Sequence, residues 1–283
     1  MSNSASERRS FGARLTQAMQ DRGPLCVGID PHPALLAQWG LADDAAALRT
    51  FSHSVLEATA DIAAAIKPQV ALFERHGSRG LGVLEEILAE ARELGVLTIA
   101  DAKRGDIGST MQAYAEAWLA DGSPLAADSL TVSPYLGFES LRPALDLAAE
   151  TGRGIFVLAL TSNPEGASVQ HVGGQDSVAR RIIEAVAQEN SRVTAGLGSV
   201  GLVVGATVAA VARDLGIDLA SSRAPLLAPG LGAQGATATD MREDFGHAWS
   251  QVLASSSRGI LKAGPSVEGL RAATLETISS LQG

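Results

Sequence analysis

The 283-residue sequence contains little cysteine and few aromatic residues. Cys26 is its only cysteine, so no disulfide can form within the chain, and such cysteine usage is typical of proteins in a reducing compartment such as the cytoplasm. Cys26 lies in an apolar stretch, and we therefore interpret it as a buried thiol with a packing role. Aromatic residues make up only 4% of the chain, whereas alanine and glycine are abundant. Small side chains of this kind favour close packing of helices on a sheet.

Long apolar runs and an excess of basic residues are also missing. No apolar run reaches the ~18 residues that a membrane span requires, and residues 1–10 lack the apolar core of a signal peptide. We therefore expect a cytoplasmic protein with no membrane partner. The net charge of −9 argues against a general nucleic-acid binder. An anionic substrate must then be held by local donors, because the overall field repels it.

The sequence does contain a repeated alternation of short apolar runs and helical patterns. The apolar runs predict eight strands, at residues 24–30, 62–67, 97–101, 126–132, 154–160, 199–205, 224–228 and 257–261. Apolar residues at three- and four-residue spacing predict a lead-in helix at 10–22 and one helix after each strand, at 43–60, 78–94, 107–121, 137–151, 176–195, 208–215, 239–253 and 267–281.

Strict alternation of strands and helices is typical of an α/β fold with a parallel sheet. Eight units in this length predict one (β/α)₈ TIM barrel domain over residues 1–283, with residues 1–23 as an N-terminal extension and helix. An open, doubly wound sheet is the alternative. Functional groups of such barrels lie where strands end. Polar residues occupy those places: Asp30, Lys67, Asp101, Lys103, Ser162, Gln234 and Arg258.

The densest group of such residues is the segment 101–110, DAKRGDIGST. Asp101 and Lys103 are two positions apart, so on extended backbone their side chains point to the same side. Asp106 comes after the turn and need not share that direction. For an isolated D-x-K pattern, a structural ion pair with Asp106 as a helix cap is the simpler interpretation. The other polar residues at strand ends favour a functional site instead.

DAKRGDIGST, with AIKPQ one strand earlier, resembles the orotidine 5′-phosphate decarboxylase family. GID in the first strand, TSNPEG after the fifth, APGLGAQG after the seventh and SRG at the eighth extend the resemblance over nearly the whole chain, and the SNPEG form is similar to the longer bacterial (type 2) subgroup. The resemblance implies cofactor-free and metal-free decarboxylation of orotidine 5′-phosphate to uridine 5′-phosphate and CO₂ in pyrimidine biosynthesis.

The resemblance also implies a role for each matched residue. The catalytic charges would be an alternating chain of Lys67, Asp101, Lys103 and Asp106. The protein would be a homodimer in which Asp106, together with Thr110, completes the site of the neighbouring subunit. Substrate contacts would come from Asp30 to the ribose hydroxyls, from Ser162 to the pyrimidine amide edge, and from Gln234, Arg258 and the backbone amide of Gly259 to the 5′-phosphate.

The residue types suit this chemistry. Loss of CO₂ from C6 of the pyrimidine leaves an electron pair in the ring plane, which the ring cannot easily delocalise, and the sequence carries no pyridoxal-phosphate or thiamine signature. The ammonium of Lys103 would stabilise this carbanion and donate the proton. Burial disfavours a charged lysine, whereas flanking carboxylates favour it. Asp101 would also repel the substrate carboxylate.

Three other functions share parts of this pattern. Keto-gulonate-phosphate decarboxylase and hexulose-phosphate synthase also carry D-x-K-x-x-D, but they resemble metal-dependent sites with an additional acidic ligand, whereas the second strand here ends in Lys67, Pro68 and Gln69. The five histidines show no metal-ligand spacing. A class I aldolase would form a Schiff base on Lys103 or Lys67. A barrel that binds a nucleotide without turnover is the third alternative.

Overall fold

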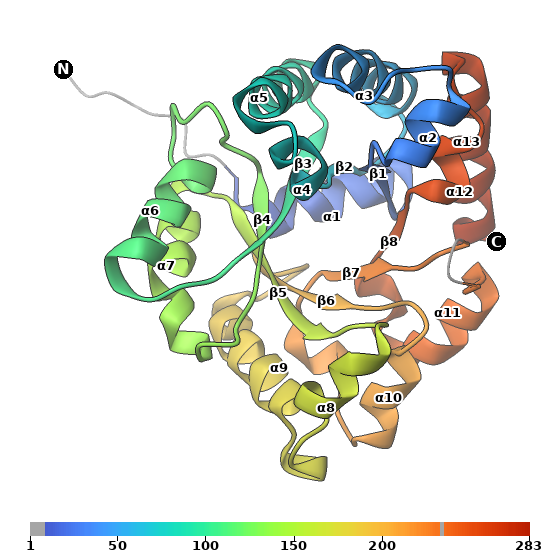
Figure 1. Ribbon diagram of the computed structural model, residues 1–283. Coiled ribbons are helices and arrows are strands. Elements are labelled where there is room, and N and C mark those ends of the chain that lie inside the picture. The colour runs from blue at the N-terminus through green and yellow to red at the C-terminus, as the bar shows by residue number, and fades with distance from the viewer. Residues whose placement is uncertain (1–8, 233–234) are drawn as a thin grey trace.

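A computed structural model of the chain describes residues 9–232 and 235–283. Within these residues, eight parallel strands form a closed barrel in sequential order, with the last strand beside the first (Figure 1). The strands are β1 (Leu25–Ile29), β2 (Ala65–Pro68), β3 (Leu97–Arg104), β4 (Ser129–Val132), β5 (Gly154–Leu160), β6 (Val200–Val204), β7 (Leu226–Pro229) and β8 (Val252–Ser256). The predicted (β/α)₈ barrel is confirmed. The open doubly wound sheet is wrong, because such a sheet has two edge strands.

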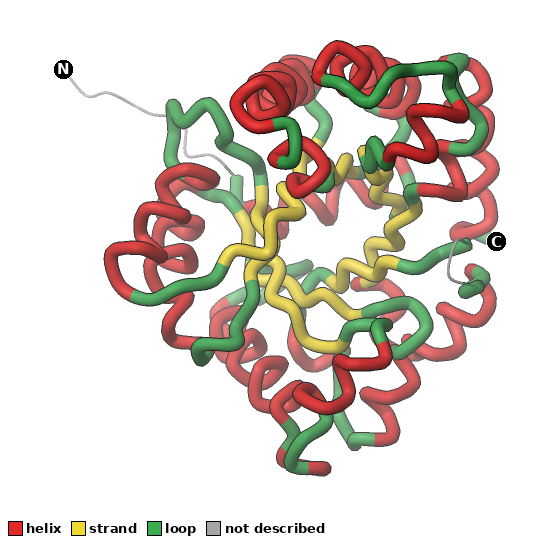
Figure 2. Tube along the Cα trace, in the orientation of Figure 1, coloured by secondary structure: helices red, strands yellow, loops and turns green. Residues whose placement is uncertain are grey.

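Helices surround the ring of strands (Figure 2). They are α1 (Phe11–Arg22), α2 (Pro33–Gln38), α3 (Ala45–Thr59), α4 (Val70–Glu74), α5 (Gly77–Leu94), α6 (Gly108–Leu119), α7 (Arg142–Thr151), α8 (Ala167–Gln170), α9 (Val178–Glu189), α10 (Ala209–Asp214), α11 (Ala238–Phe245), α12 (Arg258–Leu261) and α13 (Val267–Gln282). Short 3₁₀ turns cover Phe138–Leu141, Pro164–Gly166, Gly174–Asp176, Asn190–Arg192, Ala220–Ser222 and Gly246–Gln251. The helices missed from the sequence (α2, α4, α8 and α12) are too short to show a repeating apolar pattern.

The predicted eighth strand is wrong. β8 is Val252–Ser256, part of which lies in the helix predicted at 239–253, and the residues predicted as the strand form the short helix α12. The apolar pair Ile260 and Leu261 fits one turn of helix as well as a strand, and both side chains are fully buried. Val252–Ser256 forms the eighth strand because it pairs with β7 on one side and β1 on the other. This pairing is not visible in local sequence.

α1 closes the amino-terminal end of the barrel and passes behind the strands in Figure 1. Its Phe11 and Leu15 are buried in an interior cluster with residues of most strands, including Cys26 and Phe156. The Phe11 and Phe156 rings meet edge to face at 5.9 Å between centroids. Gly154 is required here, because a Cβ at this position would lie 2.2 Å from the Phe11 ring. The buried position of Cys26 confirms its interpretation as a packing residue.

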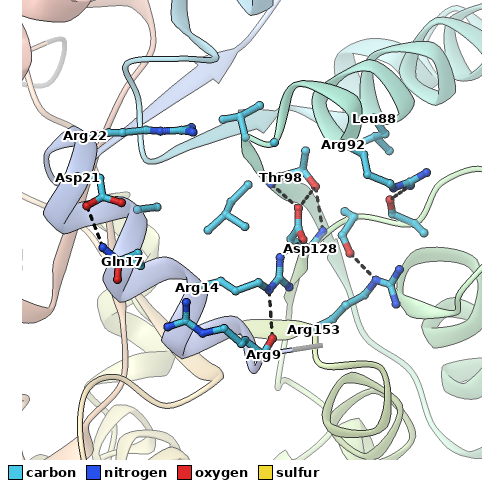
Figure 3. Close-up of a pocket in the computed structure, with 16 residues that line it drawn as sticks. Arg9, Arg14, Gln17, Asp21, Arg22, Leu88, Arg92, Thr98, Asp128 and Arg153 are labelled. Atoms are coloured by element: carbon cyan, nitrogen blue, oxygen red, sulfur yellow. Dashed lines mark hydrogen bonds and ion pairs between the residues drawn. The ribbon is translucent and has the colours of Figure 1, made fainter. Parts of the chain in front are cut away.

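A pocket of about 420 Å³ lies beside α1 at the same end (Figure 3). Arg14 of α1 forms an ion pair with Asp128 and donates a second hydrogen bond to the carbonyl of Gly152 at 3.1 Å. The other Asp128 oxygen accepts from the backbone N–H and the hydroxyl of Thr98, at 3.0 and 3.1 Å. The guanidinium of Arg153 donates to the carbonyl of Ala127. These charges tie α1 and the strand ends together.

Candidate active site

The carboxyl-terminal end of the barrel interior carries charge where the amino-terminal end is apolar. Ala65 on β2 and Ile99 on β3 belong to the interior apolar cluster. Because side chains alternate along a strand, Lys67 and Asp101, two positions further, point into the same interior. Lys67 is 6% exposed and Asp101 is 8% exposed. A buried lysine and a buried aspartate on neighbouring strands can both stay charged only if they meet.

Asp101 accepts hydrogen bonds from four groups of the described residues. Its Oδ2 accepts from Lys67 Nζ at 2.8 Å and from Gln69 Nε2 at 3.1 Å. Its Oδ1 accepts from Lys103 Nζ at 2.6 Å and from Thr131 Oγ1 at 3.0 Å. The carboxylate is therefore a fixed anion whose two oxygens are both hydrogen-bonded twice.

The two buried charges hold each other ionised. Burial raises the pKa of Asp101. The charges of Lys67 and Lys103 and their hydrogen bonds lower it by more than burial raises it, so the pKa lies well below the usual range. Burial lowers the pKa of Lys67, but the carboxylates of Asp101 and Asp30 raise it, and the net result lies above the usual range. Asp101 is thus a poor proton acceptor, and Lys67 is a poor proton donor at neutral pH.

Lys103 reaches Asp101 by a route that simple alternation does not provide. β3 continues to Arg104 instead of ending at Asp101, and Lys103 has a φ of +49°, in the left-handed region that residues with a Cβ rarely adopt. The two side chains lie on the same side, as their spacing predicts, but the extended backbone assumed for this prediction is wrong at Lys103. The side chain of Lys103 is 47% exposed, in contrast to buried Lys67.

Asp106 and Thr110 lie apart from this charge cluster in the described chain. The carboxylate of Asp106 accepts a hydrogen bond from the backbone N–H of Ile107 at 2.8 Å. Ile107 itself is the N-cap of α6 and makes no side-chain capping bond, so the alternative in which Asp106 caps the helix is wrong. Thr110 is exposed on the first turn of α6. The structure therefore brings together three of the four predicted charges: Lys67, Asp101 and Lys103.

A cleft of about 970 Å³ opens above β1, β2, β7 and β8. Asp30, Lys67, Ser257 and Arg258 line it together with Gly230 of the loop after β7. Asp30 Oδ2 accepts from the Ser257 hydroxyl at 2.6 Å, whereas the buried Oδ1 has no hydrogen-bond partner among the described residues. Within that part of the chain, a buried carboxylate oxygen without a partner marks a place for a ligand donor.

Arg258, Gly259 and Ser162, three further predicted residues, follow strands β8 and β5 at the same end of the barrel. Arg258 begins α12, directly after the corrected β8, and Gly259 follows it in the same turn. Ser162 is half-buried in the loop after β5 and is not part of the cleft lining. Gln234 lies outside the described residues. Of the predicted residues, Lys67, Asp101 and Lys103 therefore meet in one cluster, and Asp30 and Arg258 line the adjoining cleft.

Sequence reasoning missed three residues that contact the site. Gln69 and Thr131 both bond Asp101, and Ser257 bonds Asp30. Thr131 could have been found from its position, because it lies inside an apolar strand where a hydroxyl needs a partner. In the parts of the chain that the structure describes, no group of three or more His, Cys, Asp or Glu side chains is placed to hold a metal ion. No helix among these residues is long and apolar enough to cross a bilayer.

The sequence is similar to known proteins over most of its length. It matches the model of the orotidine 5′-phosphate decarboxylase / HUMPS family over residues 23–273. A Streptomyces coelicolor protein named orotidine 5′-phosphate decarboxylase is 57% identical over 266 residues, which cover 93% of this chain and 94% of that protein. A Salinispora arenicola protein of the same name is 56% identical over the same shares of the two chains.

Solved structures give the same result. The crystal structure of a protein from Streptomyces avermitilis, described as a candidate orotidine 5′-phosphate decarboxylase, has a TM-score of 0.92 and 55% identity, and the match covers 97% of this chain and 95% of that one. The structure of Leishmania donovani OMP decarboxylase has a TM-score of 0.77 and 31% identity, with 96% and 98% covered.

Proposed function

Because the chain belongs to the orotidine 5′-phosphate decarboxylase / HUMPS family, we propose that it converts orotidine 5′-phosphate to uridine 5′-phosphate and CO₂ in pyrimidine biosynthesis. The observation that carries this proposal is the Lys67–Asp101–Lys103 charge cluster at the carboxyl ends of the strands. The relatives that share about half or more of the sequence support it, because each bears the name of that enzyme.

Lys103 is the residue that we assign to the reacting carbon. An ammonium has three N–H donors, and one of them bonds Asp101. The exposed half of the side chain leaves the others accessible to a bound pyrimidine. A positive charge at C6 stabilises the in-plane carbanion, and one N–H then supplies the proton. The hydrogen bond to Asp101 directs the Lys103 side chain, while Lys67 balances the buried negative charge.

This arrangement disfavours the Schiff-base alternative. An aldolase lysine must be neutral to attack a carbonyl group. Lys103 lies 2.6 Å from an ionised carboxylate, and the pKa of Lys67 is raised by its neighbouring carboxylates despite its burial. The charged form of Lys67 cannot attack a carbonyl group to form a Schiff base. We propose that the reaction runs in the cytoplasm without a metal or cofactor, and the single buried cysteine suits that compartment.

The cleft provides groups that can bind the ribose and the 5′-phosphate of the substrate. The unpartnered oxygen of Asp30 is suited to accept from a ribose hydroxyl. Arg258 is suited to bind the 5′-phosphate, because a guanidinium forms bidentate hydrogen bonds with phosphate oxygens, and we assign the Gly259 amide and Gln234 to the same group. Ser162 is assigned to the amide edge of the pyrimidine. Binding energy from the phosphate can be used to order the reacting end of the nucleotide.

We further propose a homodimer in which Asp106 and Thr110 complete the site of the neighbouring subunit. Three large apolar side chains, Ile107, Tyr135 and Leu136, are exposed on the loops after β3 and β4. The two loops are adjacent, because the N–H of Ser133 donates to the carbonyl of Arg104 at 2.8 Å. An apolar patch beside Asp106 is suited to be covered by a second copy of the chain.

The reaction is tested by following the absorbance of orotidine 5′-phosphate with purified protein in EDTA. We expect rapid turnover that Lys103→Ala abolishes, since that variant loses both the charge and the proton. Arg49→Ala is the control, because it removes an exposed cation that pairs with Glu86 between α3 and α5, and turnover should not change. If turnover required added Mg²⁺ and a sugar phosphate, the protein would instead belong with the metal-dependent branch of the family.

Shared sites are tested by mixing two inactive variants, Lys103→Ala and Asp106→Ala. A mixed dimer holds one intact site and one doubly altered site, so random exchange is expected to restore about a quarter of wild-type activity. Mass spectrometry verifies the exchange of subunits. If verified mixed dimers stay at background activity, Asp106 does not serve the neighbouring site.

A further inference from the structure

The strand that carries Asp101 and Lys103 contains a local irregularity opposite a single residue of β4. Ala100 pairs with Leu130, and the next paired residues are Arg104 and Val132. Three residues of β3, 101–103, therefore stand opposite only Thr131. Bulges of this kind redirect side chains and are common next to active sites. Here the bulge includes the left-handed backbone of Lys103, a conformation that is unfavourable for a residue with a Cβ and needs support from its surroundings.

The hydroxyl of Thr131 provides that support. The backbone N–H of Lys103, which has no regular ladder partner in the bulge, donates to Thr131 Oγ1 at 3.0 Å. Thr131 Oγ1 in turn donates to Asp101 Oδ1 at 3.0 Å, a shorter contact than the 3.5 Å to the Ala100 carbonyl. The directions are unambiguous, because the amide can only donate and the ionised carboxylate can only accept. Thr131 is 1% exposed, so these hydrogen bonds lie away from bulk water.

These bonds close a ring. The backbone of Lys103 binds Thr131, Thr131 binds Asp101, and Asp101 binds the ammonium of the same Lys103 at 2.6 Å. We propose that Thr131 is a positioning residue, which holds both ends of Lys103 and aims its ammonium at the reacting carbon. The proposal rests on the proposed decarboxylation for the reacting carbon, but the placement of Lys103 stands on the hydrogen bonds alone.

The test compares Thr131→Val, which keeps the shape but loses the hydroxyl, with Thr131→Ser, which keeps the hydroxyl. We expect Thr131→Val to lower kcat for orotidine 5′-phosphate about 10- to 100-fold, with a change in KM of less than about threefold, and Thr131→Ser to stay within about threefold of wild type. Thr274→Val is the matched control. It removes an equally buried hydroxyl that bonds the Leu270 carbonyl in α13, far from the site, and kcat should not change.

A second measurement needs no substrate. The Lys103 amide should exchange its hydrogen slowly in wild type and in Thr131→Ser, and at least about tenfold faster in Thr131→Val, measured under conditions where each variant is folded. In the kinetic test, equal kcat in wild type and Thr131→Val would overturn the positioning role. Equal losses of kcat in Thr131→Val and Thr131→Ser would overturn it as well. If wild type does not turn over orotidine 5′-phosphate while exchange follows this pattern, the proposed function fails and the placement of Lys103 by Thr131 stands. Unchanged exchange in Thr131→Val would overturn the placement itself.

Discussion

At the amino ends of the strands, Arg14 pairs with Asp128 (Figure 3). The other hydrogen bonds of Arg14 go to the carbonyls of Arg9 and Gly152, and the second Asp128 oxygen accepts from Thr98. At the carboxyl ends, Lys103 pairs with Asp101, but half of the lysine side chain is exposed and one oxygen of nearby Asp30 has no partner among the described residues. The same type of ion pair thus has two uses. Where all donors and acceptors around an ion pair bond other groups of the protein, the pair holds structural elements together. Where some donors or acceptors have no protein partner, they can bind a ligand.

The same Asp→Asn substitution should have different effects at the two ends of the barrel. Asp101→Asn should lower kcat by about 10²–10³-fold, because Lys103 loses its charged partner. It should also lower the free energy of unfolding by about 3–5 kcal/mol, because Lys67 stays buried without its counter-charge. Steady-state kinetics and urea unfolding give the two numbers.

Asp128→Asn is the matched control at the other end. It should lower the free energy of unfolding by about 1–3 kcal/mol, through the hydrogen bonds lost to Arg14 and Thr98. Its kcat should equal that of wild type. A large loss of kcat in Asp128→Asn, or an unchanged kcat in Asp101→Asn, would contradict the division between the two ends.

Truncation of Phe11 in α1, which closes the amino-terminal end of the barrel, should affect stability alone. Phe11→Ala removes a fully buried ring that packs edge to face on Phe156. The expected loss is about 3–5 kcal/mol of unfolding free energy, with kcat unchanged at temperatures where the variant is folded. Thermal unfolding measures the loss of stability, and kcat is measured about 20 °C below the unfolding midpoint, where the variant is folded. A fall in kcat in folded protein would mean that the packing of α1 also shapes the site.

The charge cluster should also appear in the pH dependence of stability. The pKa of folded Asp101 is depressed, so its contribution is complete above the unfolded value near 4 and is lost as pH falls towards the folded pKa. The pKa of folded Lys67 is raised, so its contribution is complete below about 10.5 and is lost as pH rises through a higher value. Urea unfolding between pH 2 and 7 should therefore show a steeper acid loss in wild type than in Asp101→Asn. Equal slopes would show that Asp101 is not held ionised.

The smallest effect concerns Cys26. Burial raises the pKa of its thiol to about 12, and the charge of Lys67 lowers it only partly. A neutral, buried thiol reacts slowly, because the thiolate is the nucleophile. A disulfide reagent at pH 8 should therefore label the native protein far more slowly than the urea-unfolded protein. Equal labelling rates would place Cys26 in contact with solvent and contradict the packing of the interior.

Sequence reasoning performed best where the signal was local. The range predicted for β5 matches the observed strand, and the predicted end of α5 before Gly95 matches as well, because Gly95 adopts the left-handed conformation that ends a helix. The family resemblance predicted that Lys67, Asp101 and Lys103 share one site, and in the structure both lysines donate hydrogen bonds to Asp101. The strand predicted at 257–261 failed, because a short apolar pair has no period of its own.

The sequence alone predicted the alternation of strands and longer helices, favoured a barrel over an open sheet, and indicated polar residues at the strand ends. Each of these follows from apolar spacing and short motifs that neighbouring residues carry. Contacts between distant segments were needed to locate β8, to show how α1 closes the barrel, and to show how Thr131 bridges Lys103 and Asp101. These features depend on pairing and packing between segments far apart in the chain, and the strained backbone of Lys103 is stable only because such a partner meets it.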